Sequence, residues 1–183
     1  AGVTFSSQLQ ANSDFGEFNN NLNVAQTLLQ QENGEPLARE NLEKAKAALE
    51  KIEAGNVATP EEKAILRFQY TQLADSENHT ALLNLYRQSP QLQRTNPNLE
   101  RQLQTNQKIS EFQNQLTQNG NQINSLLTTD SSGNQTLPEN KRAAFQQLIN
   151  ARIKIYEDLK NFISSTPNDS FQGGEDHKKA MES

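Results

Sequence analysis

The chain has 183 residues and a net charge of −5; only 33% of its residues are apolar, and 43 are Asn or Gln. No apolar run approaches the roughly 20 residues that cross a bilayer, and the acidic balance argues against nucleic acid as a partner, because phosphate binding requires clustered Lys and Arg. The absence of cysteine excludes disulfides and thiolate chemistry, and two histidines are too few for a histidine-rich metal site.

The first third of the chain predicts two amphipathic helices. Ser13 and Asp14 can cap the first helix, whose apolar residues recur in steps of three and four until Gly34 ends it. Pro36 stands in the first turn of the second helix, where proline is tolerated, and Gly55 follows its end. The predicted apolar stripe of this second helix consists of Leu37, Leu42, Ala45, Leu49 and Ile52.

The clearest local signal in the chain is a helix start near residue 60. Thr59 and Glu62 have the spacing of a capping box, with proline at the first helical position between them. Asp75 and Ser76 interrupt this helix, and they can cap a shorter one that Pro90 closes. The sequence therefore predicts two helices between residues 60 and 90.

Asn96 and Pro97 predict the start of a long helix that extends to about Thr128. Its apolar seam has heptad-like steps, as in coiled coils. The seam residues are Ile109, Phe112, Leu116, Ile123 and Leu126. Asn119 is a polar residue at a seam position, and Gly120 beside it is a plausible kink or break.

A loop over residues 129–135 precedes the last helix, predicted over 138–163. This helix has the most apolar stripe of the chain: Ala144, Phe145, Leu148, Ile149, Ile153, Tyr156, Leu159, Phe162 and Ile163. A helix that is apolar over a wide arc must be surrounded or must leave an exposed patch. We expect it to be the central helix of the domain, with Leu148, Ile149, Ile153 and Leu159 largely buried.

These elements predict an all-α fold, an antiparallel bundle of five to six helices. No segment alternates polar and apolar residues for long enough to predict a sheet. The predicted bundle domain covers residues 1–166. Residues 167–183 lack the apolar content to pack and are expected to form a disordered, flexible tail.

No pattern of residues indicates catalysis, a cofactor or a metal. His79 follows Asp75 and Ser76 closely, but triad residues normally converge from distant segments, so we interpret this stretch as a turn between helices. The neighbouring acids Glu61 and Glu62 fit a helix N-terminus, where negative charge is favoured. The sequence contains no phosphate-binding glycine loop, so no catalytic, cofactor-binding or metal-ligating residue is predicted.

The last helix holds the candidate partner-binding residues. Should its aromatic residues lie exposed together, its wide stripe would be an interaction surface rather than a core. The candidates are Phe145, Arg152, Tyr156 and Phe162. Several basic residues on this helix could serve an acidic partner, although a solvated face explains them as well.

The functional hypothesis is a non-enzymatic helical interaction or scaffold module with a protein partner. It could come from an exported bacterial protein such as a secretion component or effector, since the lack of cysteine suits a secreted or periplasmic location. One alternative is a bundle that binds a small apolar ligand or lipid between its helices. Another is an enzyme or toxin that acts without a recognisable motif.

Overall fold

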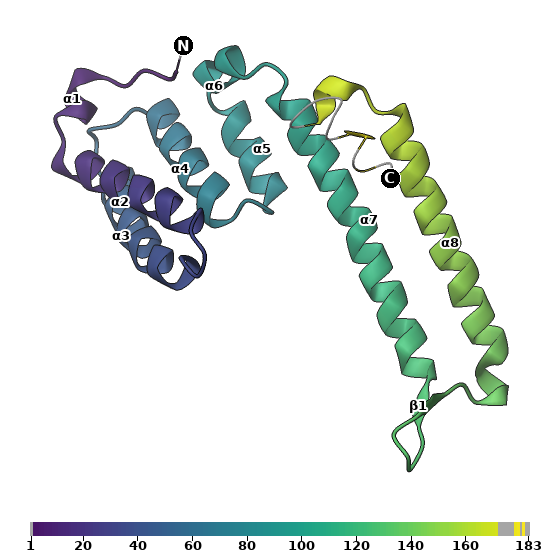
Figure 1. The fold of residues 1–183 in the computed structure, drawn as a ribbon. Helices are drawn as coiled ribbons and strands as arrows, with labels where there is room; N and C mark the ends of the chain where they lie inside the picture. The colour runs from purple at the N-terminus through teal and green to yellow at the C-terminus, as the bar shows by residue number, and fades with distance from the viewer. Residues whose placement is uncertain (1, 172–177, 180, 182–183) are drawn as a thin grey trace. The chain divides into compact units, whose positions relative to one another are not determined.

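A computed structural model of the chain describes residues 2–171, 178–179 and 181, and it confirms the all-α helical bundle (Figure 1). Residues 2–171 contain eight α-helices, six of them with seven or more residues. They are α1 (Ser7–Gln10), α2 (Ser13–Leu29), α3 (Glu35–Ala54), α4 (Pro60–Ala74), α5 (His79–Arg87), α6 (Pro90–Thr95), α7 (Leu99–Leu126) and α8 (Arg142–Ser165). The short elements are the 3₁₀ turns η1 (Glu139–Lys141) and η2 (Asn168–Ser170) and the strands β1 (Thr128–Thr129) and β2 (Gln135–Thr136).

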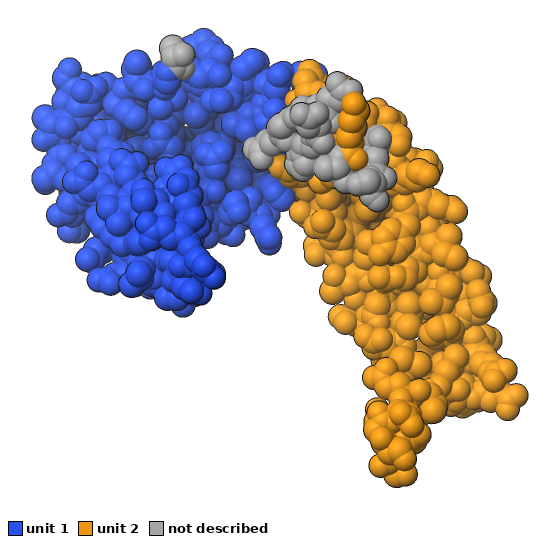
Figure 2. All heavy atoms as spheres, in the orientation of Figure 1, with its two compact units in different colours: residues 1–103 blue, residues 104–183 orange. Residues whose placement is uncertain are grey.

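The chain divides into two compact units, unit 1 at residues 1–103 and unit 2 at residues 104–183 (Figure 2). The division falls inside α7. Unit 1 therefore contains α1 to α6 with the first turn of α7, and unit 2 contains the rest of α7 and α8. The predicted boundary between residues 166 and 167 stays a prediction.

Side-chain caps fix the helix starts of unit 1. The Thr59 hydroxyl accepts a hydrogen bond from the Glu62 backbone N–H at 3.1 Å, and the Glu62 carboxylate accepts one from the Thr59 N–H at 2.9 Å. The predicted capping box is therefore confirmed. Two other caps differ from prediction: Asn12, not Ser13, caps α2, and Asn78 caps α5. In both cases an Asn oxygen reaches the free N–H groups of the first turn.

The turn between α2 and α3 depends on a glycine at position 34. The first of these helices ends at Leu29, earlier than predicted, and Asn33 in the turn has a positive φ of 61°. A Cβ atom at Gly34 would lie 1.7 Å from the Leu28 carbonyl oxygen, so no other residue fits without moving the backbone. This close approach brings α3 back along α2.

Alanines allow α2 and α3 to approach each other closely. Three of the buried positions of α3 are Ala38, Ala45 and Ala48. The predicted stripe is confirmed at Ala45, Leu49 and Ile52. It is wrong at Leu37, which is 61% exposed. The face of α3 that packs inward therefore begins at the neighbouring alanine, a residue that periodicity weights less than leucine.

Glu61 and Glu62, the adjacent acids at the start of α4, have structural roles. Glu61 accepts hydrogen bonds from the Gln91 backbone N–H at 2.8 Å and from the Ser89 hydroxyl at 3.3 Å, and so it binds the start of α6. Glu62 also accepts a hydrogen bond from the Ser6 N–H at 2.7 Å. Burial opposes its charge, but these backbone hydrogen bonds prevail and lower the pKa of Glu62.

In unit 2, α7 and α8 run antiparallel, side by side, joined by a short hairpin (Figure 1). The predicted break at Gly120 is wrong, because α7 continues through it to Leu126. The predicted loop is confirmed, with β1 and β2 pairing at its base and the Asp130 carboxylate accepting hydrogen bonds from two backbone N–H groups within it. Gly133, with a φ of 84°, provides the left-handed residue of this loop.

The residues after α8 begin with a packed segment. Phe171 is 1% exposed and lies in a cluster with Ile109 and Ile163. The Lys178 ammonium group donates hydrogen bonds to the carbonyls of Ser164 and Thr166 at the end of α8. The expected absence of packing is therefore wrong at Phe171. The same expectation for residues 172–177, 180 and 182–183 lies outside the described residues.

Candidate interaction surface

The long apolar stripe of α8 is covered on only part of its width. Of the nine stripe residues, only Ile163 is buried; Ile153 is 51% exposed and Tyr156 is 50% exposed. At 100° per residue, the stripe from Phe162 to Ile153 spans about 180° of the helix circumference. Among the described residues of unit 2, α7 is the only long helix beside α8, and one neighbour cannot cover such an arc. The predicted burial is therefore wrong at Ile153 and incomplete at Leu148, Ile149 and Leu159, which are half-buried.

The contact between α7 and α8 is polar at its centre. Asn119 is 4% exposed, and its side-chain amide donates a hydrogen bond to the Leu148 carbonyl at 2.9 Å. The Arg152 guanidinium donates to the Asn119 side-chain oxygen at 3.3 Å and to the Leu116 carbonyl at 3.2 Å. A Cβ atom on Gly120 would lie 3.6 Å from the Arg152 Nη1 atom, an ordinary van der Waals distance, so the guanidinium lies close to α7 at this position. A buried polar pair of this kind fixes the register of two helices.

Two of the four predicted site residues lie together. The Arg152 guanidinium lies 5.4 Å from the centre of the Tyr156 ring and donates a hydrogen bond to its hydroxyl at 3.4 Å. Arg152 is half-buried, and its contacts with α7 give it a structural role. The Tyr156 ring remains half exposed above it, and its role in partner binding stays a prediction.

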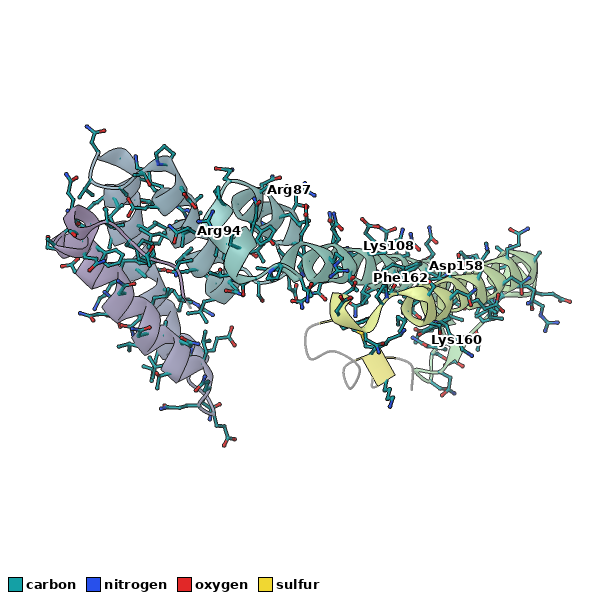
Figure 3. The ribbon with its side chains drawn as sticks, turned by 90° about the horizontal axis from the view of Figure 1, so that it is seen from above. Arg87, Arg94, Lys108, Asp158, Lys160 and Phe162 are labelled. Atoms are coloured by element: carbon teal, nitrogen blue, oxygen red, sulfur yellow. The ribbon has the colours of Figure 1, made fainter. Side chains whose placement is uncertain are left out.

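The other two predicted site residues lie apart from this pair. Phe162 contacts Phe112 of α7, with ring centres 6.0 Å apart, and the Lys108 ammonium lies 5.3 Å from the same Phe112 ring. Figure 3 shows Phe162 and Lys108 near the same end of the α7–α8 helix pair. Phe145 is half-buried near the other end, about 25 Å away along the helix at 1.5 Å per residue. Phe145 and Phe162 therefore do not form one surface with each other.

The continuous exposed surface of α8 combines the predicted candidate Tyr156 with two isoleucines that were expected in the core. Ile149, Ile153 and Tyr156 follow at steps of four and three, so they lie on one face of the helix. We call these three residues the α8 flank. Ile149 is half-buried and the other two are exposed. The signal in the sequence was the width of the stripe, which exceeds what one neighbouring helix covers.

Two cations continue the α8 flank along the same face. Arg142 lies seven residues before Ile149, and Lys160 lies seven residues after Ile153, each close to two helical turns away. Both are exposed, and neither makes an ion pair with another described residue. In contrast, Lys154 on the adjacent face pairs with Asp158 at 3.5 Å. The flank is thus an apolar centre with a free positive charge at each end.

The described residues include no group of acids and histidines placed to hold a metal ion. His79 was predicted in the turn between helices; it is the first residue of α5, directly after that turn. None of the helices described in the structure is long and apolar enough to cross a membrane. Comparisons with protein-family models, with curated proteins and with solved structures find no match to this chain.

Proposed function

We propose that the chain is a non-enzymatic helical interaction module and that the α8 flank is its partner-binding face. The observation that supports this most is the exposure of Ile153 and Tyr156, at 51% and 50%, one turn apart on the same face. Apolar side chains that are contiguous and exposed are typical of protein interaction surfaces. The half-buried Ile149 extends the apolar face by one more turn.

The chemistry of the flank indicates the kind of partner. An amphipathic helix with apolar residues in steps of three and four would match Ile149, Ile153 and Tyr156. The free cations Arg142 and Lys160 lie about 27 Å apart along α8. Acidic residues toward both ends of the partner helix would complement them. Tyr156, supported from below by Arg152, is suited to be the central contact, since tyrosine is enriched among residues that dominate binding energy.

The cellular setting is also part of the proposal. A lack of cysteine fits a protein exported from a bacterial cell, for example a component or an effector of a secretion system. In that setting a helical surface of this kind would serve assembly with another protein.

A capture experiment with paired variants tests the proposed surface. The wild-type chain is used as bait in lysate from the source cells, and stoichiometric partners are quantified by mass spectrometry. Ile153→Asp places a charge in the centre of the flank and should reduce capture of the partner about tenfold or more. Lys160→Glu reverses the charge at one end of the α8 flank. It should reduce capture less than Ile153→Asp does, with a stronger effect at low salt.

Two control variants introduce the same types of substitution, an apolar residue to Asp and a lysine to Glu, at exposed positions of unit 1. Leu37→Asp alters an exposed leucine of α3, and Lys46→Glu alters an exposed lysine of the same helix. Both should leave capture unchanged. If the partner is retained by Ile153→Asp but lost with Leu37→Asp, or if the bait captures no stoichiometric partner, the proposal is wrong.

A further inference from the structure

A second surface, on unit 1, has a different chemistry from the α8 flank. Helices α2 and α4 border a groove of about 440 Å³. Its walls carry five amide side chains, Asn19, Asn23 and Gln26 from α2 and Gln69 and Gln72 from α4. Leu22 and Leu73 provide the apolar part of the lining, and no charged or aromatic residue lines it. We call this hollow the amide groove.

The amides of this groove are arranged in a row and are free to bind. Asn19, Asn23 and Gln26 follow at steps of four and three, so they lie on one face of α2. Gln69 and Gln72, three residues apart, do the same on α4. Among the described residues, none of the five side chains has a hydrogen-bond partner. Their donors and acceptors are reachable from solvent, because the described residues contain no buried side-chain nitrogen or oxygen atom without a partner.

The same unit already uses an amide side chain to hold a non-helical stretch of backbone. The Gln91 side-chain oxygen accepts a hydrogen bond from the Thr4 N–H at 2.8 Å, and its side-chain nitrogen donates one to the Thr4 carbonyl at 3.1 Å. One planar amide thereby satisfies both polar groups of one residue in the stretch before α1. A glutamine or asparagine presents the same donor and acceptor pair as a peptide group, which makes it suited to this task.

We propose that the amide groove binds an extended, uncharged polypeptide segment of a partner through its backbone. The amides of α2 and α4 hydrogen-bond to N–H and C=O groups of the segment, as Gln91 does to Thr4. Leu22 and Leu73 contact a small apolar side chain of the segment. From Asn19 to Gln26 the row measures about 10 Å, which spans roughly three residues of extended chain.

The lining also argues for this class of ligand over others. The lining has no cation or anion to pair with a charged ligand and no aromatic ring on which a nucleobase could stack. Because the hydrogen bonds go to the backbone, the site tolerates many sequences. Charged segments bind less well, since a charge in the groove would lose water without gaining a counter-ion.

The test uses an immobilised array of short, uncharged peptides as the probe for the full chain. The tightest-binding peptide is then made in solution, with and without N-methyl groups on alternate backbone amides, and affinities are measured by calorimetry. N-methylation removes the donors that the groove would bind, so binding should weaken about tenfold or more. The double variant Asn23→Ala/Gln69→Ala should weaken binding of the unmodified peptide to a similar extent.

The control is a double variant with the same types of change outside the groove. Gln113→Ala/Asn114→Ala removes two exposed amides of α7 and should leave affinity unchanged. Circular dichroism of both double variants checks that the fold is retained, which is expected because the altered side chains make no internal hydrogen bonds. The proposal is overturned if no peptide binds, if N-methylation has no effect, or if the groove variant binds as the wild type does. Binding of an uncharged oligosaccharide in place of peptides would also overturn it.

Discussion

The two units differ in how fully their apolar residues are covered, although both are built from amphipathic helices with similar polar faces. Of the buried apolar residues in the described part of the chain, twenty lie in unit 1 and four in unit 2. Helices of unit 1 have neighbours on more than one side, whereas α8 in unit 2 has one long neighbour. The comparison teaches that the number of neighbours, and not the apolar content of a helix, decides which stripe becomes a core.

Unit 2 should depend most on the few residues that are buried in it. Phe171 is fully buried against Ile109 and Ile163, so Phe171→Ala should destabilise unit 2 by about 3–5 kcal/mol. Because the chain has no tryptophan, chemical denaturation followed by circular dichroism measures this loss of unfolding free energy. A variant that unfolds at the wild-type denaturant concentration would show that the segment after α8 adds nothing to the unit.

A matched pair of isoleucines compares the two units directly. Ile65 of α4 is fully buried in unit 1, and Ile65→Ala should cost about 2–5 kcal/mol of unfolding free energy. Ile153 of α8 is half exposed, and Ile153→Ala should cost less than about 1 kcal/mol. Urea unfolding of both variants provides the two numbers. Equal losses would mean that α8 is covered as well as α4 is.

The polar centre of the α7–α8 contact should contribute an intermediate amount. Asn119→Ala removes the hydrogen bonds to the Leu148 carbonyl and from Arg152, and it should destabilise unit 2 by about 1–3 kcal/mol. Asn124→Ala, an exposed asparagine on the same helix, is the control and should cost little. Thermal unfolding of both variants measures the difference. If Asn119→Ala is no less stable than Asn124→Ala, the buried amide does not hold the two helices in register.

Glu62 should give unit 1 a dependence on acidic pH. Its folded pKa is lowered from the ordinary value of 4.5, so its contribution is fully present above that value and is lost as the pH falls below it. Glu62→Gln should destabilise unit 1 near neutral pH and make its stability less dependent on pH below about 5. Denaturant unfolding of both proteins at several pH values tests this. Parallel pH profiles would show that the hydrogen bonds from Ser6 and Thr59 do not favour the charged form.

The sequence predicted those features of the fold that depend on neighbouring residues. The capping box of Thr59 and Glu62, the first-turn Pro36 and the stop at Gly55 are local, and all three were found where predicted. The caps of α2 and α5 differed because Asn12 and Asn78 compete with nearby residues that cap equally well. In these two places several residues satisfy the same pattern, and only the folded chain selects one.

Features that depend on distant segments were not predictable in this way. The exposure of Ile153 follows from how many helices surround α8, which periodicity does not report. Gly120 was expected to kink or break α7, but the helix continues through it, and the Arg152 guanidinium of another helix lies close to it. The candidate residues Arg152 and Tyr156 do meet, yet the α8 flank and the amide groove became visible only once the helices were placed side by side.

Native-state hydrogen exchange of the isolated chain tests most directly whether the stripe of α8 is left uncovered. Amides of α8 should exchange through small openings and be protected roughly a hundredfold less than amides of α4, because few buried apolar contacts hold α8 in place. The residues around Ile153 and Ile65 provide the comparison within one experiment. Equal protection of α8 and α4 would contradict the account, since it would mean that the apolar stripe of α8 is covered and is not available to a partner.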